Sequence, residues 1–201
     1  MDIFWLVVSL IILVGMLGLL LWYIYRRRNP KQGAPKSSTD NIGAAVSAAR
    51  WFAQTNGYRI IAPYTLTRGE KTTTLDALVI GYFGVLGVKA LGYNGEVYGD
   101  ADEEEWLQVG AKETRTYFAN PIRQAAADVR LLRDALFAHK LKQVPVEVVC
   151  VFTSPRAQLA LPRSTGHYTL KEFKALLRKD KYQQDNGFDV EKVEKALQTG
   201  K

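Results

Sequence analysis

The chain has 201 residues but only one cysteine and two histidines. A lone thiol, Cys150, excludes an internal disulfide and a thiolate metal site, and it fits a reducing compartment. His139 and His167 lie far apart, with no motif around either of them. We therefore expect exposed or helix-end histidines rather than metal ligands or a catalytic pair.

Several catalytic signatures are also missing. The sequence has no G-x-S-x-G nucleophile elbow, no Walker loop and no Rossmann fingerprint. Each of these motifs places a nucleophile or a phosphate-binding backbone at a tight turn, so their absence argues against the corresponding hydrolases, nucleotide triphosphatases and dehydrogenases.

Charge is missing from one long stretch, residues 3–25, which contain no Asp, Glu, Lys or Arg. As a helix this stretch would span roughly 35 Å, enough to cross a hydrocarbon core of about 30 Å. Aromatic residues at both ends, such as Trp5 and Trp22, match the residues preferred at membrane interfaces. A cleaved signal peptide would need a basic start and a small-residue cleavage site, so we predict a retained transmembrane helix.

The charges that follow this stretch are all basic at first. Arg26, Arg27 and Arg28 lead into a Pro-, Gly- and Ser-containing segment, and we interpret residues 26–38 as a basic linker. The positive-inside rule then predicts a single-pass protein of the cell membrane with its N-terminus outside and its C-terminal domain in the cytoplasm.

The rest of the chain is long enough for one domain with its own core. Helical periodicity begins at Thr39 or Asp40 and ends at Gly57, and a second helix is capped by Asn120 and continues to about Leu141. Strand patterns lie between and after these helices. We predict an α/β domain over residues 39–179, with a mixed central sheet flanked by helices, and a C-terminal helical tail over 180–201.

The most informative stretch consists of two expected strands, 73–80 and 85–91, joined by a turn at 81–84. Asp76 is the only acid in the first strand and Lys89 the only charge in the second. Because a buried charge is costly unless it is paired or binds a metal, each needs a reason. Either the two form a simple ion pair, or they belong to a functional site.

This stretch resembles the nuclease-related domain (NERD) family of the PD-(D/E)xK nuclease-like group. An Asp in one strand is followed by a Gly-rich turn, a strand ending in Val-Lys and a Gly-x-Val-x-Gly segment, and the Asn120 helix opens with N-P-x-x-Q. The resemblance implies a restriction-endonuclease-like fold. It also implies a site in which an Asp and a Glu-x-Lys on adjacent strands hold Mg²⁺ and steady the phosphate.

Carried over residue by residue, the resemblance assigns catalytic positions to Asp76 and Lys89, with Asp76 as a metal ligand, and it places Gln124 near the active centre. The Glu position falls on Gly87, which has no side chain to bind a metal, and the first helix lacks the acid that it often carries in the family. Glu96 is a weak substitute ligand. Parity of the second strand puts Gly87 and Lys89 on one face, so we expect Gly87 to open space beside the lysine.

Two further acidic features have simpler explanations. Glu70 is either a displaced ligand or an acid in a surface turn, and the acidic run at residues 100–105 is typical of a solvated loop.

The formal net charge is +7, and part of it lies on the Asn120 helix. Arg123, Arg130 and Arg133 share one broad face and could bind the phosphates of a nucleic acid. The same face could instead be an ordinary solvated surface or rest on anionic lipid.

From the residues and the resemblance we expect a membrane-anchored NERD-like protein that associates with DNA or RNA and has a degenerate nuclease site. Two alternatives remain open. An active nuclease would hold Mg²⁺ through Asp76 and substrate oxygens. A non-catalytic membrane adaptor would use the fold as an interaction surface for protein partners that the sequence does not identify.

Overall fold

The computed structural model describes residues 13, 15–20 and 39–198. The expected transmembrane helix at 3–25 falls mostly outside these residues, and the linker at 26–38 falls entirely outside them. Within the described residues, no helix combines the length and the apolar character needed to cross a membrane. The fold below is that of the unit Pro35–Lys201.

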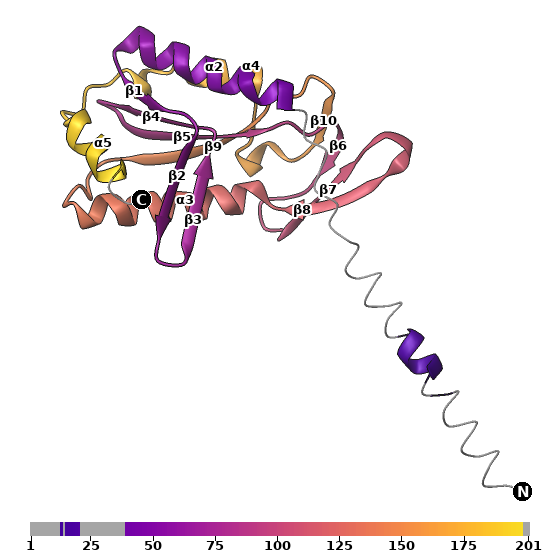
Figure 1. Cartoon of the computed structure of the whole chain (residues 1–201). Helices are drawn as coiled ribbons and strands as arrows, with labels where there is room; N and C mark the ends of the chain where they lie inside the picture. The colour runs from indigo at the N-terminus through magenta and orange to yellow at the C-terminus, as the bar shows by residue number, and fades with distance from the viewer. Residues whose placement is uncertain (1–12, 14, 21–38, 199–201) are drawn as a thin grey trace, which may run out of the picture. The chain divides into compact units, whose positions relative to one another are not determined.

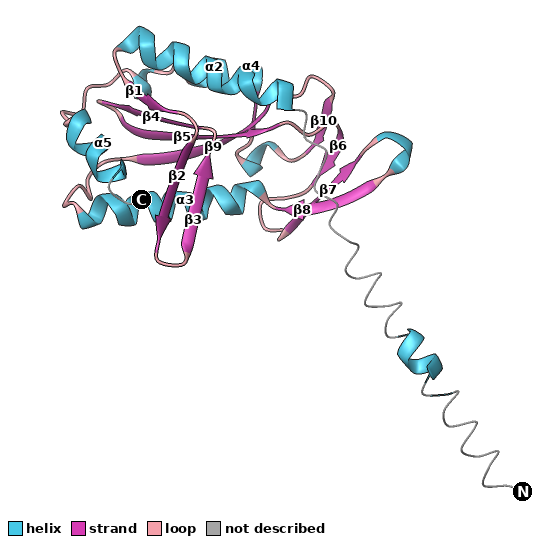
Figure 2. Ribbon diagram, viewed as in Figure 1, coloured by secondary structure: helices cyan, strands magenta, loops and turns pink. Residues whose placement is uncertain are grey.

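The main sheet has five strands in the order β1-β4-β5-β9-β11 (Figures 1 and 2). β4 runs antiparallel to its neighbours β1 and β5, whereas β9 and β11 continue the sheet in parallel with β5. This is the predicted mixed sheet. The strands are β1 Arg59–Ile61, β4 Ala77–Gly81, β5 Gly84–Leu91, β9 Val146–Phe152 and β11 Tyr168–Thr169.

Helices cover both faces of this sheet. On one face, side chains of α2 and α4 pack on β4, β5 and β9 and form what we term the α2-side core. On the other face, α3 and α5 pack on the same sheet and form the α3-side core. Figure 1 shows α2 and α4 together on one side and α3 on the other. The helices are α2 Thr39–Asn56, α3 Pro121–Ala138, α4 Leu170–Leu176 and α5 Val190–Gln198.

A second, four-stranded sheet follows the order β10-β6-β7-β8. It packs through Trp106, Val97 and Phe118 against Phe152 at the end of β9. A separate hairpin, β2-β3, precedes β4. These strands are β2 Tyr64–Arg68, β3 Lys71–Leu75, β6 Gly95–Tyr98, β7 Glu105–Val109, β8 Arg115–Ala119 and β10 Ala157–Ala160, and the short 3-10 helices are Ala111–Glu113, Arg163–Thr165 and Asp180–Tyr182.

Several expected elements are present with their expected ends. Asn120 caps α3 by accepting hydrogen bonds from the N–H groups of Ile122 and Arg123, and Pro121 occupies the first turn. Thr169 and Glu172 form a capping box at the start of α4. β10 is an edge strand of the second sheet.

Other expectations were wrong. The expected strand at 73–80 is interrupted at Asp76, and α3 ends at Ala138 rather than near Leu141. The buried face of α3 includes Leu131 and Ala135, whereas Phe137 is 67% exposed.

The expected C-terminal helical tail includes α5, which contributes to the core. Val193, Ala196 and Leu197 are buried in the α3-side core. The buried Tyr64 hydroxyl donates a hydrogen bond to the carbonyl of Leu197 at 2.9 Å, and burial raises the pKa of Tyr64 to about 12. The residues after 180 are therefore part of the domain's packing.

Candidate active site

Asp76 lies at a β-bulge between β3 and β4. Leu75 and Leu78 both point into the α3-side core, although strict alternation would place residues three apart on opposite faces. One extra residue is therefore inserted at this point, as in a β-bulge. The backbone N–H of Asp76 still donates to the carbonyl of Val88 at 2.9 Å.

The Asp76 carboxylate bonds the backbone of β5 where the bulge interrupts the pairing of the strands. Its Oδ2 accepts a hydrogen bond from the backbone N–H of Ala90 at 2.7 Å. The other oxygen accepts no hydrogen bond from any residue in the described part of the chain. Asp76 thus has a structural role on β5 and keeps one carboxylate oxygen available.

Lys89 is paired with an acid from α3, not with Asp76. Its Nζ lies 2.5 Å from Oδ2 of Asp128, and the hydroxyl of Thr73 donates to Oδ1 of the same carboxylate at 2.5 Å. The Lys89 and Asp128 side chains are only 18% and 10% exposed. Within the described residues no ion pair joins Asp76 to Lys89, so the simple pairing considered from the sequence was wrong.

Asp128 was not among the residues predicted from the sequence. It lies three residues after Ala125 and four before Leu132, both of which are buried. An acid between buried positions of a helix needs a partner, as Asp76 and Lys89 do in their strands. This pattern in the sequence could have identified Asp128.

Gly87 does not open space beside Lys89. A β-carbon at this position would lie 2.8 Å from Cδ1 of Leu75 and 2.9 Å from Cγ2 of Val148. The position that carries a metal-binding Glu in the related nucleases is therefore filled by two apolar side chains. A larger residue here would have to displace them.

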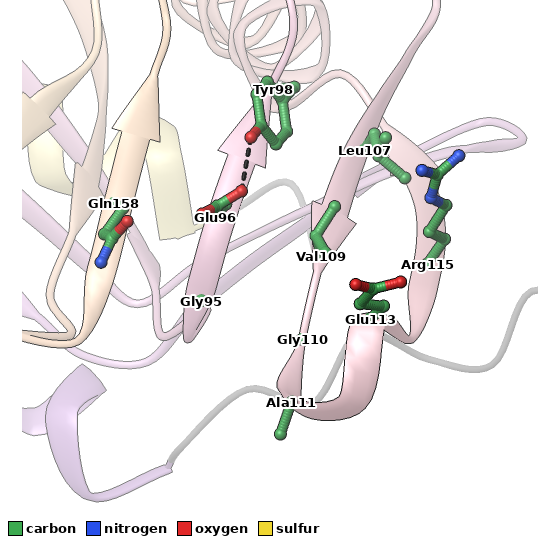
Figure 3. Close-up of a pocket in the computed structure, with 10 residues that line it drawn as sticks. All are labelled: Gly95, Glu96, Tyr98, Leu107, Val109, Gly110, Ala111, Glu113, Arg115 and Gln158. Carbon is green, nitrogen blue, oxygen red and sulfur yellow. Dashed lines mark hydrogen bonds between the residues drawn. The ribbon is translucent and has the colours of Figure 1, made fainter.

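The alternative acids lie elsewhere. Glu70 is in the exposed turn between β2 and β3. Glu96 is on β6 of the second sheet, where it accepts a hydrogen bond from the Tyr98 hydroxyl. The side chains of Glu96 and Tyr98 line a hollow of about 700 Å³, and Figure 3 shows Arg115 and Glu113 on its other side. In the part of the chain that the structure describes, no three His, Cys, Asp or Glu residues are grouped to hold a metal ion.

The donor set at the site is sparse for Mg²⁺, which is usually held by one or two carboxylates together with waters and substrate oxygens. Asp76 offers one oxygen, Gly87 offers none, and both oxygens of Asp128 are already bonded to Lys89 and Thr73. Lys89 and Asp128 therefore form a closed ion pair, and Asp76 is the acid of this centre that keeps an oxygen without a hydrogen bond among the described residues.

Gln124 lies one helical turn before Asp128 and is exposed. Residues four apart on a helix are neighbours, so Gln124 borders the outer side of the Lys89–Asp128 pair. No side-chain hydrogen bond holds it within the described residues. The Gln124 side chain is therefore available to bind a ligand.

The three predicted phosphate-binding arginines, Arg123, Arg130 and Arg133, are exposed but do not border this pair. At about 100° per residue, they point about 140–160° away from Asp128 around the axis of α3. Arg123 also contacts the acidic loop, 3.8 Å from Glu104. The structure therefore places the arginines and Lys89 on opposite sides of one helix.

Cys150 lies beside Lys89 in the register of β5 and β9. Burial raises the pKa of its thiol to about 12, with Lys89 lowering and Asp128 raising it by smaller amounts. Its Sγ donates to the Pro121 carbonyl at 3.3 Å. Such a thiol remains protonated near neutral pH and does not act as a nucleophile.

Comparison with known proteins assigns the family. Searches of curated proteins and of solved structures give no match. The family model described as nuclease-related domain matches residues 42–153, from α2 to the end of β9. This region is more than half of the chain and includes the Asp76 bulge, Lys89, Gln124 and Asp128. The chain therefore belongs to the nuclease-related domain family.

Proposed function

We propose that this protein is a membrane-anchored member of the family that binds DNA or RNA and hydrolyses it weakly or not at all. The observation that carries the proposal is the engagement of Asp128, whose two oxygens are bonded to Lys89 and Thr73. Since Gly87 replaces the expected Glu, Asp76 is the single acid left to bind a cation at this centre. Phosphodiester hydrolysis with metal ions requires carboxylates that align the cation with the scissile phosphate.

The state of Lys89 supports the same proposal. A lysine that stabilises a phosphate must present its charge to the substrate, but this ammonium is neutralised by a carboxylate at 2.5 Å. If Lys89 moved away from Asp128 to contact a phosphate, the partly buried Asp128 carboxylate would lose its partner, which is costly in free energy. In this proposal Lys89 holds α3 to β5, and nucleic acid is bound by other cations.

The test uses the full chain in detergent micelles. Labelled single- and double-stranded DNA and RNA are incubated with Mg²⁺ or Mn²⁺, and binding is measured separately by fluorescence anisotropy in EDTA. We expect saturable binding and little cleavage. Cleavage that disappears in Asp76→Ala would establish an active nuclease. The absence of both binding and cleavage would favour a protein-interaction role.

The membrane part of the proposal is supported by the uncharged residues 3–25 and the arginines at 26–28. Their order predicts a cytoplasmic domain. A reporter fused after Lys201 should work only if it is active in the cytoplasm. Activity of a reporter that requires export would overturn this orientation.

A further inference from the structure

Two hollows adjoin along α4 on the α2 side of the molecule. One, of about 880 Å³, lies at the carboxyl end of β9 and is lined by Thr153 and Ser154. The other, of about 510 Å³, lies between α2 and α4 beside Trp51. Ala44, Lys174 and Arg178 line both hollows. Together they form one elongated depression, which we term the α2–α4 groove.

The groove is basic. Lys171, Lys174 and Arg178 line it and are exposed, and they form no ion pair with any residue of the described chain. None of the residues that line either hollow is an Asp or a Glu. Glu172, which follows Lys171 in the sequence, is turned back onto Thr169. The groove is therefore complementary to an anion that extends along it.

An exposed aromatic ring lies at one end of this basic groove. The Trp51 side chain is 61% exposed, although its neighbour Phe52 is buried in the α2-side core. A large aromatic ring left in water beside unpaired cations is typical of surfaces on which nucleic-acid bases stack.

We propose that the α2–α4 groove binds single-stranded nucleic acid, with Lys171, Lys174 and Arg178 contacting phosphates and Trp51 stacking on a base. A single strand exposes its base faces to an aromatic ring, whereas a duplex conceals them. The concave shape also suits a linear polyanion better than the plane of a bilayer. This inference rests on the nucleic-acid binding in the proposed function and specifies its location.

The experiment measures anisotropy of a fluorescent 12-nucleotide oligo-dT with the full chain in micelles, in EDTA to prevent cleavage. Lys174→Gln with Arg178→Gln should weaken binding by about 10-fold or more, and Trp51→Ala by about 5-fold or more. Arg130→Gln with Arg133→Gln removes the same charge from α3 and tests the other predicted phosphate-binding surface. It should change the affinity less than about 3-fold. Far-UV circular dichroism checks that each variant is folded.

The outcomes separate the two proposals. Oligonucleotide binding that is unchanged in the groove variants but lost in the α3 variant would assign the site to α3 and overturn the groove. No binding by the wild-type chain would overturn both the groove and the proposed function. In a second arm, phosphatidylserine is added to the micelles. Tryptophan fluorescence is compared between the wild type and Trp51→Ala, so that the difference reports on Trp51. If this difference changes with the lipid and not with oligo-dT, the groove binds lipid headgroups and the proposal is overturned.

Discussion

At the scale of single residues, Lys89 is the only charge on β5, and Asp128 neutralises it from across the interface with α3. Removing a charge from water is costly, and the attraction between two partly buried charges repays that cost only when the geometry is good. Thr73 improves the geometry by bonding the second oxygen of Asp128. The pair thus fixes how α3 is rotated on the sheet as well as holding it there.

Removing one partner should therefore cost more than removing both. Asp128→Ala leaves the Lys89 ammonium without a partner and should lower the free energy of unfolding by about 3–5 kcal/mol. Lys89→Met combined with Asp128→Leu should recover most of that loss. Guanidinium unfolding of the wild type and these two variants, followed by circular dichroism, measures the difference. A double variant as unstable as Asp128→Ala would contradict the predicted cost of leaving Lys89 unpaired.

Packing at Gly87 gives a second prediction. Gly87→Ala should lower the free energy of unfolding by about 1–3 kcal/mol, because its methyl group overlaps Leu75 and Val148. Leu75→Ala in the same chain should reduce the cost of the added methyl group. The difference in guanidinium midpoints checks this. A stabilising Gly87→Ala would mean that the site is open, and Gly87→Glu alone would then be enough to install a carboxylate.

At the scale of elements, local signals predicted strand β5 and the cap of α3, because each is encoded within a few consecutive residues. The partner of Lys89 was not predicted, because Asp128 is 39 residues away and their contact depends on how α3 lies on the sheet. The bulge at Asp76 was missed for a related reason. It preserves the burial of both Leu75 and Leu78, which a search for strict alternation does not detect.

The Asn120 side chain joins two elements. Besides capping α3, its Nδ2 group donates to the carbonyls of Asp100, Ala101 and Glu103 in the acidic loop. Asn120→Ala should lower the free energy of unfolding by about 2 kcal/mol, the upper part of the range for helix caps. Asn120→Asp is the control, because it keeps the acceptor and loses the donors. Equal stability of Asn120→Ala and the wild type would contradict this role.

At the scale of the whole molecule, the β2-β3 hairpin and α5 contact each other although they are far apart in the chain. Tyr64 and Leu197 are 133 residues apart and share a buried hydrogen bond. The α3-side core therefore includes residues from β2 as well as from α5.

Leu197→Ala should lower the free energy of unfolding by about 2–5 kcal/mol, because it leaves a cavity in this core. Tyr64→Phe should cost about 1 kcal/mol, because it removes only the hydroxyl. Single, coincident unfolding transitions by circular dichroism and tyrosine fluorescence would support one cooperative unit. Loss of α5 in a separate, earlier transition would contradict it.

The burial of Cys150 also makes the molecule convenient for site-specific spectroscopy. It is the sole thiol of the chain, it is 1% exposed, and its pKa is raised to about 12, so maleimide reagents should leave it unmodified at pH 7. A cysteine that replaces Arg130 or Lys174 can then carry a spin label or a fluorophore, and Cys150 need not be removed. Distances from each label to a labelled oligonucleotide would locate a bound strand directly, in the full chain and in a lipid bilayer.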